Sequence, residues 1–324
     1  MPRPGKLLIP SRRMRQYILR RLVSLLPVIL GVSLITFGLM GVVPGDPAEI
    51  IASRGKDVEP TQAEIEAVRE ELGLDQPLLL QYARWLGRVV RGDLGMSLRT
   101  GQPVWHELTV RLPRTLELAA GGMIIGLLIA LPVGILSAVW RDRFLDQVSR
   151  VLALLGASVP SFWLGTILIL FFAVRLGWLP SMGRGGLRHF ILPSCALGLG
   201  TSAVLMRLTR ANLLEVLNEG FVRTARAKGL SEKAVVLRHA LKPSLLPVVT
   251  VLGLQFGNLL GGALIIETVF AWPGLGMLVL RSILGRDFPV IQGFALFITL
   301  VFVLVNFVVD LVCRWLDPRV QYGV

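Results

Sequence analysis

Residues 118–140 read LAAGGMIIGLLIALPVGILSAVW, an apolar run without Asp, Glu, Lys or Arg. A helix needs about 20 apolar residues to cross the roughly 30 Å hydrocarbon core of a bilayer, and this run is long enough. A buried core could explain one such run, but not several. The sequence therefore predicts an all-α integral membrane protein with about six transmembrane helices. The six runs without these four residue types are 22–43, 118–140, 151–174, 190–206, 245–266 and 290–309, the fourth being the shortest.

Composition and charge agree with this class. The chain of 324 residues is 53% hydrophobic and 17% charged, below the roughly 25% charged residues of soluble domains. A net charge of +13 would suggest nucleic acid in a soluble protein. Here the basic residues gather before the first run, between the second and third, between the fourth and fifth, and after the sixth. Because cytoplasmic loops retain Lys and Arg, both termini are predicted to be cytoplasmic, and no nucleic-acid partner is expected.

The alternation of six spans divides the remaining chain between the two sides of the membrane. Residues 1–21 and 315–324 become cytoplasmic segments. No small-residue cleavage site follows the first apolar run, which we interpret as a retained span. The segment 44–116 then faces outside, and the basic segment 207–244 faces inside.

The outer segment 44–116 is patterned rather than slack. Thr61-Gln62-Ala63-Glu64 fits a capping box, and Gly73 can end the helix that follows it. A second helix is predicted to start at Pro77 and stop at Gly92. We therefore expect a small helical extracytoplasmic lobe between transmembrane helices 1 and 2.

The inner segment 207–244 carries two helical patterns separated by a glycine. An apolar face precedes a basic run, Gly229 permits a sharp turn, and Ser231 can cap the second helix. A helix–glycine–helix element is suited to docking a partner, and a basic surface helix lying on lipid is the alternative. The face comprises Leu213, Leu214, Leu217, Phe221 and Val222, and the run is Arg223-Thr224-Ala225-Arg226-Ala227-Lys228-Gly229-Leu230.

The sequence contains no motif for ATP hydrolysis or metal binding. It has no G-x-x-x-x-G-K-[ST] phosphate loop. His106, His189 and His239 are scattered without metal-ligand spacing. We therefore predict a transport subunit rather than an enzyme, with no metal site and no cofactor. The apolar runs lack carboxylates, which argues against a proton-driven carrier. A sodium-driven carrier that uses backbone carbonyls stays open.

Polar side chains inside the spans are candidates for lining a translocation pathway. Bonding from helix to helix is an equally good interpretation of each one. The candidates are Ser158, Ser161, Thr201, Ser202, Gln255 and Asn258.

Several ordered motifs resemble a known family. They include Pro44-Gly45-Asp46-Pro47, Gly92-Asp93-Leu94-Gly95-Met96-Ser97, Arg111-Leu112-Pro113-Arg114-Thr115-Leu116-Glu117-Leu118, Ser158-Val159-Pro160-Ser161-Phe162-Trp163 and Glu267-Thr268-Val269-Phe270-Ala271-Trp272-Pro273-Gly274-Leu275-Gly276. From about Tyr17 to Val320 the chain resembles the membrane permease subunits of bacterial dipeptide, oligopeptide and nickel ABC importers. The resemblance implies a type I importer permease fold, with its transmembrane domain at 111–314.

The resemblance also implies partners and a role for the inner segment. In this family the corresponding loop docks onto a separate ATPase subunit. Ala225 and Gly229 match its pattern, whereas Arg223 and Thr224 depart from the Glu-Ala that opens it. The implied assembly in the bacterial inner membrane pairs this chain with a second, homologous permease subunit. Two ATPase subunits that bind ATP and Mg and an extracytoplasmic substrate-binding protein complete it. A di- or oligopeptide is the expected substrate. The alternatives are ABC import of nickel or another small solute, and transport by an ATP-independent secondary carrier.

Overall fold

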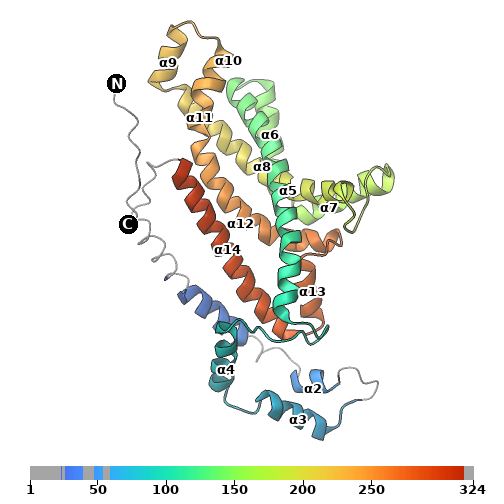
Figure 1. Ribbon diagram of the computed structural model, residues 1–324. Coiled ribbons are helices and arrows are strands. Elements are labelled where there is room, and N and C mark those ends of the chain that lie inside the picture. The colour runs from blue at the N-terminus through green and yellow to red at the C-terminus, as the bar shows by residue number, and fades with distance from the viewer. Residues whose placement is uncertain (1–22, 24–25, 39–46, 54–58, 317–324) are drawn as a thin grey trace. The chain divides into compact units, whose positions relative to one another are not determined.

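The computed structural model describes residues 23, 26–38, 47–53 and 59–316 (Figure 1). Over these residues the regular elements are helices, apart from one isolated β-bridge between Met96 and Pro103. The chain divides into two compact units. The first comprises Met1–Glu107 and Ser282–Val303, and the second comprises Leu108–Arg281 and Leu304–Val324.

Four helices are long and apolar enough to cross a membrane: α5 (Val104–Val139), α8 (Leu187–Leu217), α12 (Leu246–Val269) and α14 (Phe288–Leu316). A bent pair adds a fifth if it counts as one span. It consists of α6 (Phe144–Ser158) and α7 (Ser161–Leu168), which the π-helix η1 (Ile169–Arg175) continues. The described residues thus hold four or five candidate spans.

The bent pair corrects the predicted continuous span 151–174. The two helices meet at an angle of 104°. Pro160 lies at the break, and Val159 before it is extended, with φ −84° and ψ 125°. Proline has no N–H and disfavours helical backbone at the residue before it, so one helix ends here and another begins.

The other predicted spans fall on helices. Runs 118–140, 190–206, 245–266 and 290–309 coincide with α5, α8, α12 and α14, although α8 continues beyond Met206 to Leu217. Run 22–43 contains an apolar helix, Leu26–Gly38, that is shorter than a span. The rest of that run lies largely outside the described residues, as do segment 1–21 and most of segment 315–324. A sixth span therefore stays a prediction.

In the first unit, three short helices lie within the predicted lobe 44–116: α2 (Pro47–Ala52), α3 (Gln62–Leu72) and α4 (Leu78–Val90). The last part of the predicted lobe, from Val104 on, belongs instead to the long helix α5. The capping box is confirmed, because the Thr61 N–H donates to Glu64 Oε2 at 2.9 Å and the Glu64 N–H donates to Thr61 Oγ1 at 3.4 Å. Gly73 ends α3 with φ +66°, as predicted. Ala48, Ala52 and Ile65 form a small core between α2 and α3.

Two further contacts tie this unit together. The hydroxyls of Ser33 and Tyr82 are 2.8 Å apart, which joins the Leu26–Gly38 helix to α4. The buried Asp287 carboxylate accepts hydrogen bonds from the Ser97 hydroxyl at 2.5 Å and from the Leu98 N–H at 2.9 Å. The motif at residues 92–97 is thereby held against the segment that precedes α14.

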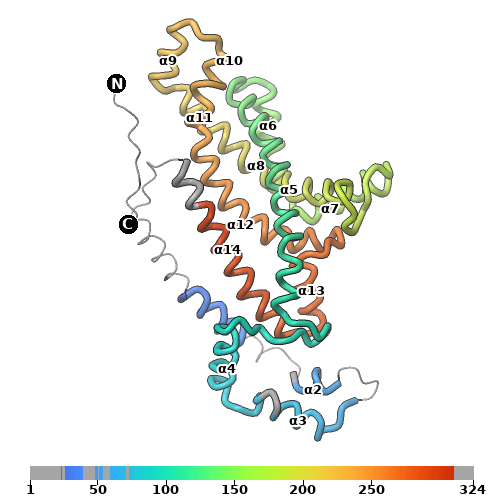
Figure 2. The backbone as a smooth tube through the Cα atoms, in the orientation of Figure 1, coloured from blue at the N-terminus to red at the C-terminus, as the bar shows by residue number. Residues whose placement is uncertain are grey.

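The second unit is built around α8, which packs against α6, α7 and α12 (Figure 2). Glycines allow α5 and α8 to approach closely. A Cβ added at Gly198 would lie 2.7 Å from the Gly122 carbonyl oxygen, and one at Gly134 would lie 2.9 Å from the Met206 carbonyl oxygen. Larger residues at these positions would push the helices apart. The small-residue pattern of the spans therefore serves helix packing.

Candidate functional site

The segment between α8 and α12 forms the predicted helix–glycine–helix element. It contains α9 (Gly220–Ala227), α10 (Glu232–Ala234), the π-helix η2 (Val235–Ala240) and α11 (Leu241–Ser244). We call residues 220–244 the α9–α11 segment. The first part of the predicted loop 207–244 is a continuation of α8, so the element stands on the end of a long helix rather than on a loop (Figure 1).

Gly229 makes the turn between the two helical parts. Its φ is +78°, and nothing lies within 4 Å of a Cβ placed there. The Gly229 N–H donates to the Arg226 carbonyl at 2.9 Å, and the Leu230 N–H donates to the Ala225 carbonyl at 3.4 Å. These two bonds form a Schellman motif, which closes a helix through one left-handed residue. The prediction that Gly229 supplies a sharp turn is confirmed, and the reason is backbone conformation rather than close approach.

Side chains brace the turn from both directions. Ser231 caps α10 as predicted, because its hydroxyl accepts from the Ala234 N–H at 3.4 Å. Arg226 donates to both carboxylate oxygens of Glu232, at 3.1 and 2.5 Å. These hydrogen bonds lower the pKa of Glu232 and raise the pKa of Arg226. A bidentate pair has a more definite geometry than a single contact, so it helps to set the angle between α9 and α10.

A compact apolar core lies beneath the turn. It joins the α9–α11 segment to the ends of α5 and α8, and it consists of Ala138, Leu213, Val222, Ala225, Val235, Val236 and Ala240. The segment is therefore packed directly onto the ends of two long helices.

The opposite side of the segment is exposed. Of the eight residues predicted to couple to a partner, Ala225 is 7% exposed and belongs to the core. The other seven are exposed, namely Arg223, Thr224, Arg226, Ala227, Lys228, Gly229 and Leu230. Phe221 and Leu237 add exposed apolar area beside them, at 48% and 51%. The surface thus combines positive charge with apolar side chains, a composition suited to docking.

The predicted pathway residues make mostly local bonds. The Ser158, Thr201 and Ser202 hydroxyls donate to carbonyls three or four residues earlier in their own helices, and Thr201 and Ser202 are buried. Asn258 Nδ2 donates to Gln255 Oε1 at 3.0 Å, one turn apart on α12. Ser161 is the first residue of α7 and is partly buried. The six come from α6, α7, α8 and α12.

Sequence reasoning missed a buried carboxylate in the last turn of α12. Glu267 is fully buried and accepts from the Thr115 hydroxyl at 2.6 Å and from the Gly276 N–H at 2.6 Å. It therefore caps the start of α13 (Leu275–Leu284). The predicted fifth span stopped at Ile266, one residue before Glu267, whereas α12 continues to Val269. The helix of this span is therefore not free of acidic side chains. A capping role was visible in principle, since Glu267 precedes a Trp-Pro-Gly turn and a new apolar helix.

Comparison with known proteins places the chain in a family. Residues 130–322 match the binding-protein-dependent transport system inner membrane component family, and residues 14–119 match its N-terminal family. The chain belongs to this family. It is a permease subunit of an ABC transporter in the inner membrane, as predicted, and not an enzyme.

Relatives and solved structures agree. The glutathione transport system permease protein GsiC of Escherichia coli O6:H1 (strain CFT073) is 45% identical over 95% of this chain and 100% of its own. The protein of the same name from Shigella dysenteriae serotype 1 is 44% identical over the same shares. A structure of the MetNI methionine ABC transporter in an inward-facing conformation is 22% identical, with a TM-score of 0.56 over 65% of this chain and 96% of that one. A structure of an amino acid ABC transporter is 18% identical, with a TM-score of 0.52 over 64% of this chain and 92% of that one. At these identities the structural likeness supports the fold alone.

Proposed function

We propose that this permease imports small peptides, with a glutathione-type tripeptide as the substrate class. The support is the 44–45% identity, over 95% of the chain, to permeases named for glutathione transport. The polar residues of α12, Gln255 and Asn258, are candidates to meet the peptide backbone, whose amides need both donors and acceptors. Nickel is the alternative that the test below distinguishes.

The α9–α11 segment is the proposed docking site for an ATPase subunit. The observation that carries this proposal is the Gly229 turn, which stands on a packed core and presents exposed basic and apolar side chains. A rigid knob on the ends of α5 and α8 can transmit movement, whereas a slack loop would absorb it. ATP and Mg would be bound by the ATPase subunits, because this chain has no phosphate loop.

The proposed assembly places the α9–α11 segment in the cytoplasm with both termini, and the α2–α4 lobe outside. Six spans in all would cross the membrane. A second, homologous permease would supply the other half of the pathway, two ATPases would bind inside, and a substrate-binding protein would deliver peptide from outside. Positive charge supports this orientation, since Arg and Lys are retained on the cytoplasmic side.

Uptake by the complete transporter in lipid vesicles tests the substrate class. The permease pair and its ATPases are reconstituted, and the binding protein is added outside. ATP-dependent accumulation of labelled glutathione, with no accumulation of labelled nickel, is expected. Accumulation of nickel and not of glutathione would overturn the peptide assignment and leave the ABC importer role intact.

A further inference from the structure

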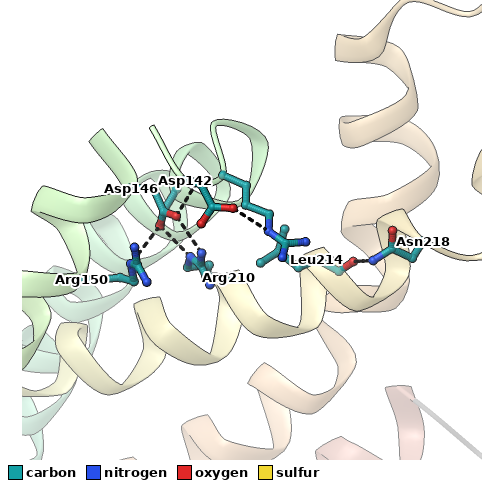
Figure 3. Close-up of polar contacts among 8 residues, drawn as sticks. Asp142, Asp146, Arg150, Arg210, Leu214 and Asn218 are labelled. Atoms are coloured by element: carbon teal, nitrogen blue, oxygen red, sulfur yellow. Dashed lines mark hydrogen bonds and ion pairs between the residues drawn. The ribbon is translucent and has the colours of Figure 1, made fainter. Parts of the chain in front are cut away.

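Beside the α9–α11 segment lies a buried ionic network centred on Asp146, in the first turn of α6 (Figure 3). The side chain of Asp146 has no exposed surface. Arg210 of α8 donates to both of its carboxylate oxygens, from Nε and from Nη2, each at 2.7 Å. The Ser137 hydroxyl of α5 donates at 2.5 Å, and the Asp142 N–H donates at 2.9 Å. One carboxylate therefore joins α5, α6 and α8.

Two features fix the geometry of this network. A bidentate Arg–carboxylate pair is directional as well as strong. The turn that connects α5 to α6 adds a constraint, since Asp142 has φ +63°, a left-handed conformation that few residues other than glycine, asparagine and aspartate adopt. Its N–H is held by the Asp146 carboxylate, which keeps the turn closed. Arg150 reaches the same carboxylate only at 3.8 Å, and its side chain is half-exposed, so it lies outside the central pair.

The network shares its supports with the α9–α11 segment. Ser137 is followed on α5 by Ala138, which packs in the core beneath the segment. Arg210 lies one turn before Leu213 on α8, and Leu213 packs in the same core. The ends of α5 and α8 are thus held by the segment on one side and by Asp146 on the other. If the segment displaces these ends, the corner between α5 and α6 is drawn with them.

We propose that Asp146 and Arg210 are a positioning pair, which transmits movement of the α9–α11 segment to α6 and so to the bent α6–α7 unit. This inference rests on the proposed docking of an ATPase at the segment. Coupling between two sites requires an element that both of them bias, and the pair joins the helix that carries the segment to a helix that is part of a candidate span. Breaking the pair leaves docking intact and weakens its effect on transport.

The test uses the complete transporter in vesicles and measures substrate transported per ATP hydrolysed. Asp146→Asn keeps the shape of the side chain and removes its charge. The expected result is a wild-type amount of bound ATPase, continued ATP hydrolysis and a transport-to-hydrolysis ratio that falls at least about fivefold. A factor of about five is the lower end of what coupling between two sites typically produces. Arg210→Lys keeps the charge but loses the bidentate geometry, so its ratio should fall between those of Asp146→Asn and the wild type.

Two controls separate positioning from general stability. Arg150→Gln removes a cation near the same carboxylate and should leave the ratio within twofold of the wild type. The double variant D146N/R210Q leaves no buried charge unpaired and so should restore thermal stability. Its ratio should nevertheless stay low. If Asp146→Asn does not fold, this double variant and Arg210→Lys carry the test.

The outcomes are distinct. A wild-type ratio in folded Asp146→Asn, or in the double variant, overturns the positioning role. A ratio that recovers in step with thermal stability in the double variant overturns it as well, because the pair is then only structural. Wild-type levels of bound ATPase and of uptake in Gly229→Val refute the proposed docking itself, which is a different failure.

Discussion

Substitution of Gly229 by valine tests whether the turn between α9 and α10 is what the ATPase grips. Gly229 has φ +78° with open space around its missing side chain, so a new Cβ meets no neighbour. The cost is therefore conformational. The left-handed region costs an ordinary L-residue roughly 1–2 kcal/mol, and a β-branched residue is particularly poor there.

In the undocked Gly229→Val variant, the α9–α11 segment can relax to another turn, whereas the proposed docking requires the original turn. The energy of restoring it is then taken from the binding free energy. A cost of roughly 1–2 kcal/mol corresponds to a factor of about 5–30 in an equilibrium constant. We expect Gly229→Val to lower ATPase affinity by a factor in this range and to lower substrate uptake with it, while the spans still insert.

Gly229→Asn is the matched control. Asparagine also adds a side chain, but it tolerates the left-handed conformation, and its Cβ meets no neighbour at Gly229. Near wild-type docking is expected. Ala225→Glu attacks the same element from beneath by placing an unpaired charge in a buried position, and it should also release the ATPase.

The assay purifies each variant through a tag on this chain, quantifies the bound ATPase and measures uptake by the reconstituted complex. Arg69→Ala, in the α2–α4 lobe, serves as a distant control and should retain the ATPase. Wild-type levels of bound ATPase and of uptake in Gly229→Val would refute the docking role of this turn. Residues 141–150 would then be the next segment to test.

The isolated chain, its topology and two of its carboxylates offer further tests. The purified chain should hydrolyse no ATP, and turnover that a mutation in this chain abolishes would contradict that. Cysteines at Glu66 and Lys233 should label from opposite sides of the membrane, and labelling of both from outside would contradict the predicted topology. Glu267→Ala should lose about 1–3 kcal/mol of stability by leaving buried donors unpaired, whereas Glu267→Gln, which keeps an acceptor, should unfold closer to the wild-type temperature. The Arg226–Glu232 pair lowers the pKa of Glu232, so its stabilisation is present above the usual carboxyl pKa and is lost as pH falls through the lowered one. Melting temperatures of wild type and Glu232→Gln should therefore converge in acid, and a constant difference would exclude this origin.

Much of the fold follows from the sequence, because two strong local signals dominate it. Long apolar runs predict helices with little dependence on their neighbours, and four of the six predicted runs coincide with long helices. Caps are equally local, since Thr61, Gly73, Gly229 and Ser231 each act on residues within a few positions. The positive φ of Gly229 shows that a single glycine between two helical patterns was enough to place the turn.

The break at Pro160 was harder to predict from the sequence. Proline occurs inside α5 at Pro132 and inside α8 at Pro193 without ending either helix. In a bundle, neighbouring helices and side chains can satisfy the carbonyl that proline leaves free. The same residue type therefore leaves α5 and α8 continuous but stands at the 104° bend between α6 and α7. Packing decides between these outcomes, and packing is not local.

The Asp146–Arg210 pair shows the same limit at the site itself. The two residues are 64 positions apart, and each alone has an ordinary explanation. An aspartate in the first turn of a helix is stabilised by the helix dipole, and an arginine beyond an apolar run fits the cytoplasmic side of a span. Only the closeness of α6 and α8 turns them into one buried bidentate pair. Local patterns can thus predict the Gly229 turn at the proposed docking site, but the connection from that turn to the spans depends on how the helices pack.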